Sequence, residues 1–388
     1  MIETQSELKK QTSSFESELS IFNTLAKMGH EQVIVCSNPE TGLKAIIALH
    51  NTTLAPALGG TRMWMYNTEK EALKDVLRLS CGMMYKAAIS GLNLGGGKAV
   101  IVGDPQTDKT ESLFRSSGRF VDSLGGRYIT AEDVGMSVER IYSKTKYVTG
   151  ISESLGGSGT PSPVTAFGVY MGTKAAAKKT YGSDSLAGKK IAVQGAGNVA
   201  SVFAEYCAKE GAKVYITDIH IKKAENLAKK IGATFVDTDK IYGLDVDIFS
   251  PCALGGVVND YTITQFNCDI ISGGANNILD DEDVHGQMLM DKGILYAPDY
   301  VINASGIINI SSELEGYNVK QAFIQTEKIY DTTLNVFNYS EQHRIPTHKA
   351  TNELAEKRIK EAGKIKNVYT TASKLAGRLG EMYKLDNR

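Results

Sequence analysis

Apolar and polar positions in the first part of the chain follow two different periods. Amphipathic spacing begins at Thr68, whose hydroxyl can cap a helix while Glu71 reaches back to the same turn. A second helix is predicted to begin after Thr110 and to end at the glycine pair 125–126. Short apolar runs predict strands at 33–36, 43–50, 98–102 and 127–131.

From Pro163 onward, predicted strands and helices alternate regularly. Pro163 itself suits a first helical turn. This alternation is typical of a parallel, doubly wound sheet. Strands are predicted at 190–194, 213–218, 234–236, 247–250, 269–272 and 294–297, with helices at 199–209 and 221–231. We therefore predict an α/β protein: an N-terminal α/β domain followed by a Rossmann-type dinucleotide-binding domain.

A segment rich in Gly, Ser and Pro, 155–163, separates the two patterns, and we place a hinge near 160–163. The predicted domains are 1–155 and 156–345. The charged helical tail, 346–388, is predicted to fold back on the first domain. A length of 388 residues is typical of two or three domains.

Charge excludes two classes of partner. The chain has 43 Lys and Arg against 44 Asp and Glu, a formal net charge of −1, so it lacks the positive field that binds nucleic acid or anionic membranes. The longest uncharged stretch, 154–173, is interrupted by Gly, Ser and Pro, and no transmembrane helix is predicted. The first twenty residues carry charges of both signs without an apolar core, which argues against a secretory signal. We expect a cytoplasmic protein.

Cysteine and histidine give no metal or disulfide pattern. The five cysteines are an odd number without a C-x-x-C pair, so we predict neither a disulfide framework nor a thiolate zinc site. The six histidines are isolated. No metal site is predicted.

A glycine motif predicts a dinucleotide site. Gly195 permits a tight turn after a strand, Gly197 lets backbone approach a pyrophosphate at a helix N-terminus, and Ala200 allows close helix packing. Asp218 ends the next strand, where a carboxylate binds ribose hydroxyls and repels a 2′-phosphate, so NAD is favoured over NADP. The alternative is an ordinary glycine turn with a helix-capping Asp. The predicted cofactor-binding residues of this motif are Gly195, Ala196, Gly197, Asn198, Val199, Ala200, Ser201 and Asp218.

Three charged residues are candidates for proton chemistry. Lys98 follows three glycines, but the phosphate-loop spacing fails, because that motif requires Gly at position 92 and Ser or Thr at position 99. At the start of an apolar strand Lys98 is expected to be desolvated, and with Lys86 as a second cation its ammonium pKa would fall toward the useful range. Asp133 also ends a strand; its alternative is a surface ion pair. Together the three residues would suit a small zwitterionic substrate.

The motifs around these residues resemble the leucine dehydrogenases, a branch of the glutamate/leucine/phenylalanine/valine dehydrogenase superfamily. The resemblance extends from about Val33 to about Ile359. It is carried by PALGGTRMW at 56–64, GMMYK at 82–86, GLNLGGGK at 91–98, YITAEDVG at 128–135, PSPVTA at 161–166 and APDYVINA at 297–304.

This resemblance implies NAD-dependent oxidative deamination of an L-amino acid to its 2-oxo acid and ammonia, without a metal. Lys86 would bind the substrate carboxylate, Lys98 would be the general base and Asp133 the proton relay. Asn276 and Asn277 would lie near the nicotinamide and Asn303 by the substrate. The first domain would also form a large homo-oligomer, an octamer in this branch of the family.

The same resemblance implies a substrate pocket lined by aliphatic side chains. Glutamate-specific relatives have a cation and a hydroxyl at the positions of Leu58 and Ile310, so a charged substrate would lack a partner here. We therefore predict leucine, isoleucine and valine as substrates. The predicted substrate-binding residues besides Lys86 and Asn303 are Leu58, Gly59, Gly60, Met83, Val134, Ile307 and Ile310.

One departure from the family motif keeps two alternatives open. The family reads Asn-Ala-Gly-Gly where this chain has Ser305 at the third position, so a Cβ and a hydroxyl are expected to enter a loop beside the pocket. The alternatives are a phenylalanine dehydrogenase and a non-catalytic NAD-sensing protein with the same fold.

Overall fold

The computed structural model describes residues 21–365, which form two compact units. The first contains 21–84 and 93–148, and the second contains 85–92 and 149–365. The units thus divide at 148/149, whereas the sequence analysis placed the boundary at 155/156, and 346–365 belong to the second unit. The rest of the predicted tail, 366–388, lies outside the described residues. The predicted domain boundaries stay a prediction.

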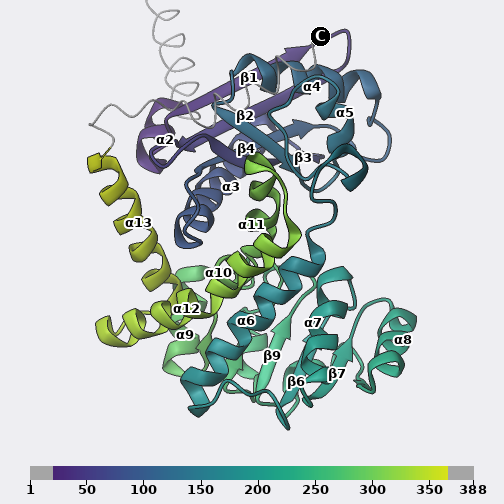
Figure 1. Ribbon diagram of the computed structural model, residues 1–388, viewed down its shortest axis with the longest axis vertical. Coiled ribbons are helices and arrows are strands. Elements are labelled where there is room, and N and C mark those ends of the chain that lie inside the picture. Colours follow the sequence, from purple (N-terminus) through teal and green to yellow (C-terminus); the bar gives the residue numbers. More distant parts are fainter. Residues whose placement is uncertain (1–20, 366–388) are drawn as a thin grey trace, which may run out of the picture. The chain divides into compact units, whose positions relative to one another are not determined.

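The first unit is built on a five-stranded mixed sheet (Figure 1). Its strands β1 and β2 run antiparallel, as do β2 and β4, while β3 is parallel to both β4 and β5. Four of the strands match the predicted ones. The sequence analysis missed β3, because its glycine pair interrupts the apolar alternation. In spatial order the strands are β1 (Gln32–Asn38), β2 (Leu43–Asn51), β4 (Gly95–Val102), β3 (Ala57–Trp64) and β5 (Tyr128–Glu132).

The cap predicted at Thr68 is present, and the second predicted helix is capped by Thr110. Thr68 Oγ1 accepts the Glu71 N–H at 3.1 Å, and the Glu71 carboxylate accepts the Asn67 N–H at 2.9 Å, which satisfies two donors of the first turn. Thr110 accepts the Leu113 N–H in the same way. The helices are α2 (Ile21–Met28), α3 (Glu69–Ile89), α4 (Glu111–Ser123) and α5 (Val138–Tyr142).

One face of the sheet packs against α3. Val76 and Leu77 of α3 form a buried cluster with Ile46 of β2 and Val100 of β4. Since side chains alternate along a strand, Lys98, two residues before Val100, lies on the same face. Packing of α3 therefore covers the lysine that the sequence analysis singled out.

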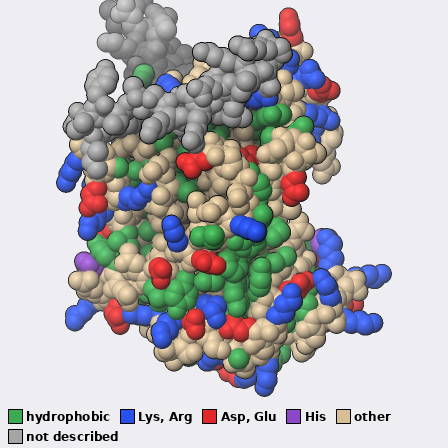
Figure 2. Space-filling view, in the orientation of Figure 1, with side chains coloured by type: hydrophobic (Ala, Val, Ile, Leu, Met, Phe, Trp, Pro, Cys, Tyr) green, Lys and Arg blue, Asp and Glu red, His purple; other side chains and the backbone are tan. Residues whose placement is uncertain are grey.

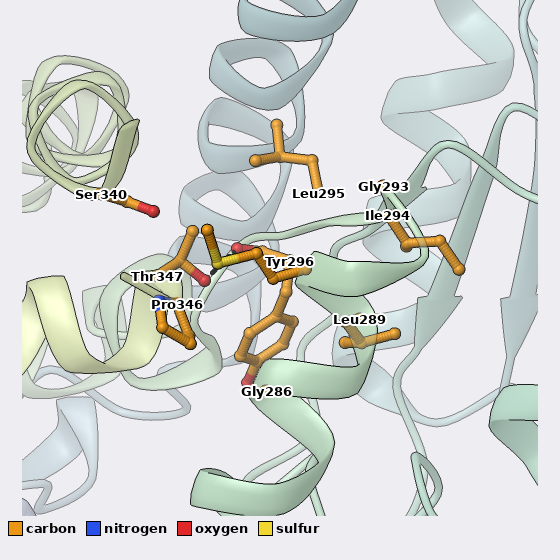
Figure 3. A pocket seen from close by; sticks show the side chains of 10 residues that line it. Gly286, Leu289, Gly293, Ile294, Leu295, Tyr296, Ser340, Pro346 and Thr347 are labelled. Atoms are coloured by element: carbon orange, nitrogen blue, oxygen red, sulfur yellow. Dashed lines mark hydrogen bonds between the residues drawn. The ribbon is translucent and has the colours of Figure 1, made fainter. Parts of the chain in front are cut away.

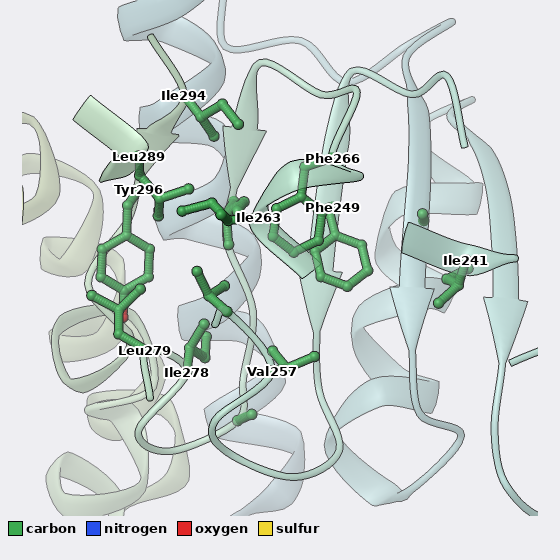
Figure 4. Close-up of a cluster of buried hydrophobic side chains, with 14 of the residues drawn as sticks. Ile241, Phe249, Val257, Ile263, Phe266, Ile278, Leu279, Leu289, Ile294 and Tyr296 are labelled. Atoms are coloured by element: carbon green, nitrogen blue, oxygen red, sulfur yellow. The ribbon is translucent and has the colours of Figure 1, made fainter. Parts of the chain in front are cut away.

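The second unit is built on a six-stranded parallel sheet, as predicted for a Rossmann-type domain. On one side of this sheet Phe249, Phe266, Leu289 and Tyr296 belong to one buried apolar cluster (Figure 4). In spatial order the strands are β11 (Leu295–Tyr296), β10 (Ile270–Ile271), β9 (Ile248–Pro251), β6 (Lys190–Gln194), β7 (Lys213–Thr217) and β8 (Thr234–Phe235).

Two helices of this unit approach each other closely at a glycine. A Cβ on Gly172 of α6 would meet the Ile302 side chain at 2.2 Å, so α10 and α6 approach closely only because this position is glycine. The helices are α6 (Ser162–Tyr181), α7 (Asn198–Lys209), α8 (Ile221–Ile231), α9 (Glu282–Asp291), α10 (Asp299–Ile302), α11 (Ser305–Ser311), α12 (Val319–His343) and α13 (Thr347–Ile365), with short 3-10 turns η1 (Glu153–Leu155), η2 (Ile241–Gly243), η3 (Thr262–Thr264) and η4 (Ser312–Glu315).

The described residues also bear on the expectations for membrane spans, metal sites, cysteines and pockets. Within residues 21–365, no helix is both long and apolar enough to cross a bilayer, and no cluster of His, Cys, Asp and Glu could hold a metal ion. All five cysteines are free. On the face shown in Figure 2, charged side chains of both signs are interspersed. A cavity beside α9 and β11, lined by Leu289, Tyr296 and Thr347 among others (Figure 3), contains none of the predicted site residues.

Candidate active site

The first unit brings Lys98 and Asp133 into contact. Lys98 lies on β4, Asp133 follows β5, and β3 runs between these strands. The Lys98 ammonium contacts Asp133 Oδ2, and only 8% of the lysine side chain is exposed. Gly60 of β3 makes this possible, because a Cβ there would lie 2.9 Å from the Asp133 Cβ and 2.6 Å from the Glu132 carbonyl oxygen. The glycine thus leaves room for the ion pair to form across β3.

Two cations hold the Asp133 carboxylate in its ionised form. Burial alone would raise the pKa of Asp133, but the charges of Lys98 and Arg62 outweigh burial and lower it. The Val134 N–H also donates to Asp133 Oδ1 at 2.7 Å. A buried ammonium in contact with an ionised carboxylate forms a pair that can pass a proton.

The second cation of this cluster is Arg62, which the sequence analysis did not identify. Its Nε lies 3.5 Å from Asp133 Oδ2, and its Nη1 lies 3.1 Å from Asp75 Oδ2 on α3. Lys86, the predicted companion, belongs to the second unit. There its charge opposes the rise that burial causes in the pKa of Asp299. Its predicted contact with the substrate carboxylate stays a prediction.

Several predicted pocket residues also lie in the first unit. Leu58 of β3 is fully buried, and Gly59 beside it is packed so tightly that a Cβ would lie 1.7 Å from the Gly97 carbonyl oxygen and 3.2 Å from Met83 Cγ. Val134 differs from these residues, because half of its side chain is exposed. The structure therefore groups Leu58, Gly59 and Met83, while the role of each in substrate binding stays a prediction.

The glycine motif of the second unit forms a turn between β6 and α7. Gly195 has φ 114°, and a Cβ would lie 3.1 Å from the Cys252 carbonyl, so both conformation and space require glycine. Gly197 precedes α7, has open space where a Cβ would be, and leaves the helix without a side-chain cap. Ala200 is fully buried. Uncapped N–H groups beside open space at a helix N-terminus fit a pyrophosphate.

Asp218 follows β7 beside this turn. Its Oδ2 accepts the Ala196 N–H at 2.7 Å, and its Oδ1 accepts the His220 N–H at 2.7 Å. The carboxylate therefore supports the turn, but it caps neither α7 nor α8, so it is not the helix cap of the alternative interpretation. Each oxygen retains a second lone pair for a ribose hydroxyl, so the two roles are compatible.

Three asparagines of the predicted site are linked in the second unit: Asn276 and Asn277, which come after β10, and Asn303, which ends α10. The Asn303 amide donates to Asn276 Oδ1 at 2.9 Å, and its own Oδ1 is buried and has no hydrogen-bond partner among the described residues. Asn277, at φ 53°, donates its N–H to Asp299 Oδ2 at 2.6 Å. Asp299 also accepts the Tyr296 hydroxyl at 2.8 Å, so this buried carboxyl fixes the Asn276–Asn277 turn.

The structure corrects the expectation for Ser305. This residue does not enter a loop but begins helix α11, where its hydroxyl is buried against Gly168 of α6; a Cβ on Gly168 would lie 1.7 Å from the Ser305 Oγ. Ile307 on the same helix is buried. Ile310 lies 3.5 Å from the Cβ position of Gly150. Ser305 thus acts on helix packing.

Arg62 and Asp299 are the site residues that the sequence analysis missed. Both lie inside motifs that it quoted. Gly60 and Arg62 are two residues apart, so in a strand they lie on the same face. Because strand β3 was not predicted, the sequence analysis did not place Arg62 beside Asp133. For Asp299, an acidic residue within an apolar segment was the available signal.

Two protein-family models together match most of the chain. The model of the Glu/Leu/Phe/Val dehydrogenase dimerisation domain matches residues 30–147, and the model of the Glutamate/Leucine/Phenylalanine/Valine dehydrogenase domain matches 156–220 and 216–366. The chain belongs to this dehydrogenase family. The predicted fold class, enzyme class and family resemblance are thereby confirmed.

Its relatives in the dehydrogenase family match over nearly their full length. The leucine dehydrogenase of Thermoactinomyces intermedius is 52% identical over 354 residues, covering 90% of this chain and 96% of the relative. That of Bacillus cereus is 54% identical over 344 residues, covering 88% and 94%. The crystal structure of L-tryptophan dehydrogenase from Nostoc punctiforme is similar at a TM-score of 0.79 and 47% identity, covering 88% of this chain and 99% of that one.

Proposed function

We propose that this dehydrogenase catalyses the reversible, NAD-dependent oxidative deamination of branched-chain aliphatic L-amino acids (leucine, isoleucine and valine) to 2-oxo acids and ammonia. The observation that carries the proposal is the buried Lys98–Asp133 pair in a chain 52% identical to a leucine dehydrogenase. NAD, when bound, supplies the acceptor for the hydride that leaves the substrate Cα.

The chain's own residues would handle protons and substrate charge. Lys98 takes a proton from the substrate amine and passes it to Asp133, which relays it onward, so the neutral Lys98 amine can then take a proton from the attacking water. That second proton goes to the nitrogen that leaves as ammonia. Lys86 binds the substrate carboxylate. Burial of the Lys98 side chain excludes water, which strengthens each of these electrostatic contacts.

Substrate selection would rest on the absence of charge around the side chain. Leu58 and Ile307 are buried and aliphatic, so a distal carboxylate would lose its hydration without gaining a partner. One methylene changes selectivity by only about 1–3 kcal/mol, so leucine, isoleucine and valine should all react.

A panel of L-amino acids, assayed through NADH absorbance in both directions, tests the proposal. We expect the highest kcat/KM with one of the three branched-chain substrates. A higher value with phenylalanine or tryptophan would replace the substrate assignment, and no turnover with any amino acid would favour a protein that only senses NAD.

The cofactor assignment predicts the effect of Asp218→Ala. Removing the carboxylate removes both the acceptor for ribose hydroxyls and the repulsion of a 2′-phosphate, so we expect the ratio of kcat/KM for NAD over NADP to fall at least about tenfold. Because Asp218 also supports the Ala196 turn, Asp218→Asn is the control for packing. An unchanged ratio in both variants would contradict the ribose role.

Self-association belongs to the same proposal. The match to a dimerisation-domain model over 30–147 supports a homo-oligomer, which we propose to be an octamer in the cytoplasm. Light scattering of the purified chain distinguishes an octamer from smaller assemblies.

A further inference from the structure

A chain of charges in the first unit links helix α3 to the Lys98–Asp133 pair. Asp75 on α3 binds Arg62 at 3.1 Å, and Arg62 Nε lies 3.5 Å from Asp133 Oδ2. Arg62 therefore bridges two carboxylates, one on the helix that covers the sheet and one at the candidate active site.

Tyr66 helps to hold the bridge, because its hydroxyl donates to Asp75 Oδ2 at 2.7 Å. The other oxygen, Asp75 Oδ1, lies 3.4 Å from Nη2 of Arg78, whose side chain is 58% exposed, so this contact adds little. The exposed fractions of the Arg62, Asp75 and Asp133 side chains are 24%, 19% and 18%, so water screens these charges only partly. A planar guanidinium contacting two carboxylates through different nitrogens fixes their separation, which a lysine would not do.

We propose that Arg62 is a positioning residue of the amino-acid dehydrogenase reaction: anchored by Asp75, it holds the Asp133 carboxylate against Lys98 in its ionised form. The inference rests on the proposed function, which assigns proton relay to Asp133. It adds to that function a residue that acts through Asp133.

The groups that face Asp133 determine how its ionisation changes. Burial raises the pKa of Asp133, whereas the charges of Lys98 from β4 and Arg62 from β3 lower it and favour the ionised carboxylate. Tyr66 and Tyr128 feel the Asp133 charge but are neutral, since burial raises the pKa of each well above its usual range. Of the two cations, Lys98 is the one that must give up its proton during turnover. Arg62 is then the only remaining cation of this set that keeps Asp133 charged.

The pH profile of kcat/KM for leucine tests the proposal through Arg62→Gln. Without Arg62 the pKa of Asp133 rises, so more of the carboxylate is protonated at a given pH below neutrality. We expect kcat to fall about tenfold to a hundredfold, with KM changed less than threefold, and the acid limb of kcat/KM to move to higher pH. Arg62→Lys, which keeps the charge, should restore the acid limb but only part of kcat.

Two further variants separate positioning from general damage. Arg78→Gln removes a cation that contacts Asp75 but not Asp133, and the Arg78 side chain is 58% exposed. We therefore expect this variant to have the same kcat and the same pH profile as wild type. Asp75→Asn should reproduce the loss of kcat of Arg62→Gln, and the double variant should be no worse than either single one. A wild-type pH profile and kcat in Arg62→Gln, or fully additive losses, would overturn the proposal.

A readout that does not need turnover keeps the inference distinct from the proposed function. Acetic anhydride labels neutral amines, and mass spectrometry gives the labelling rate of Lys98 separately from other lysines. We expect Arg62→Gln to change the Lys98 rate at least about threefold at fixed pH, while Arg78→Gln leaves it unchanged, because only Arg62 adjoins the pair. An unchanged Lys98 rate in Arg62→Gln would overturn the coupling, whereas the absence of amino-acid turnover in wild type would overturn only the proposed function.

Discussion

Lys98→Ala should lower kcat for leucine by about 10²- to 10⁴-fold, the range expected when a general base is removed. The physical reason is that Lys98 supplies the buried amine in contact with an ionised carboxylate, and a water molecule in the space that its side chain leaves is a much weaker base. Steady-state kinetics in both reaction directions measure the effect. NADH affinity, measured by fluorescence, should change little, because the predicted cofactor residues lie in the other unit.

Two controls make this result specific to Lys98. Lys44→Ala removes an exposed lysine from strand β2 of the same sheet and should leave kcat unchanged. Small alkylamines added to Lys98→Ala should restore part of the rate, with greater effect as more of the amine is unprotonated. Near-normal kcat in Lys98→Ala would contradict the assignment of Lys98 as the base, and loss of NADH binding would show that the substitution had disturbed the fold.

Gly59→Ala should lower the free energy of unfolding by about 3 kcal/mol, the upper part of the range for overpacking a tight interior. A Cβ at this position would lie 1.7 Å from the Gly97 carbonyl oxygen, which is backbone of the neighbouring strand and has no rotamer through which to yield. Urea denaturation measures the change. Since Gly97 precedes Lys98, the same shift of β4 should also reduce kcat.

Gly82→Ala is the matched control for this substitution. Gly82 is exposed within α3, nothing lies within 4 Å of its Cβ position, and alanine is the better helix former by about 1 kcal/mol. The control should therefore be as stable as wild type or slightly more stable. Equal stability of the Gly59→Ala and Gly82→Ala variants would mean that β3 and β4 are less tightly packed than the structure shows.

Local sequence was enough for the elements whose signals are local. The cap at Thr68 and the boundaries of β6 and α8 follow from side chains within a few residues of each other, and the structure has them where they were predicted. Strand β3 was missed because the contacts that make it a strand are not local. Its two glycines weaken the alternation, and it is a strand because β4 and β5 bind it on both sides.

The candidate site divides in the same way. The sequence alone determined the family motifs, the glycine turn before α7, and Lys98 and Asp133 as candidates, because each of these depends on residue type and short spacing. Only the tertiary structure decided that Arg62 is the second cation beside Asp133, that Asp75 anchors it, and that Ser305 packs against α6. Those contacts join residues from different strands and helices, and the distance between such residues is set by how the elements pack, which no local pattern in the chain encodes.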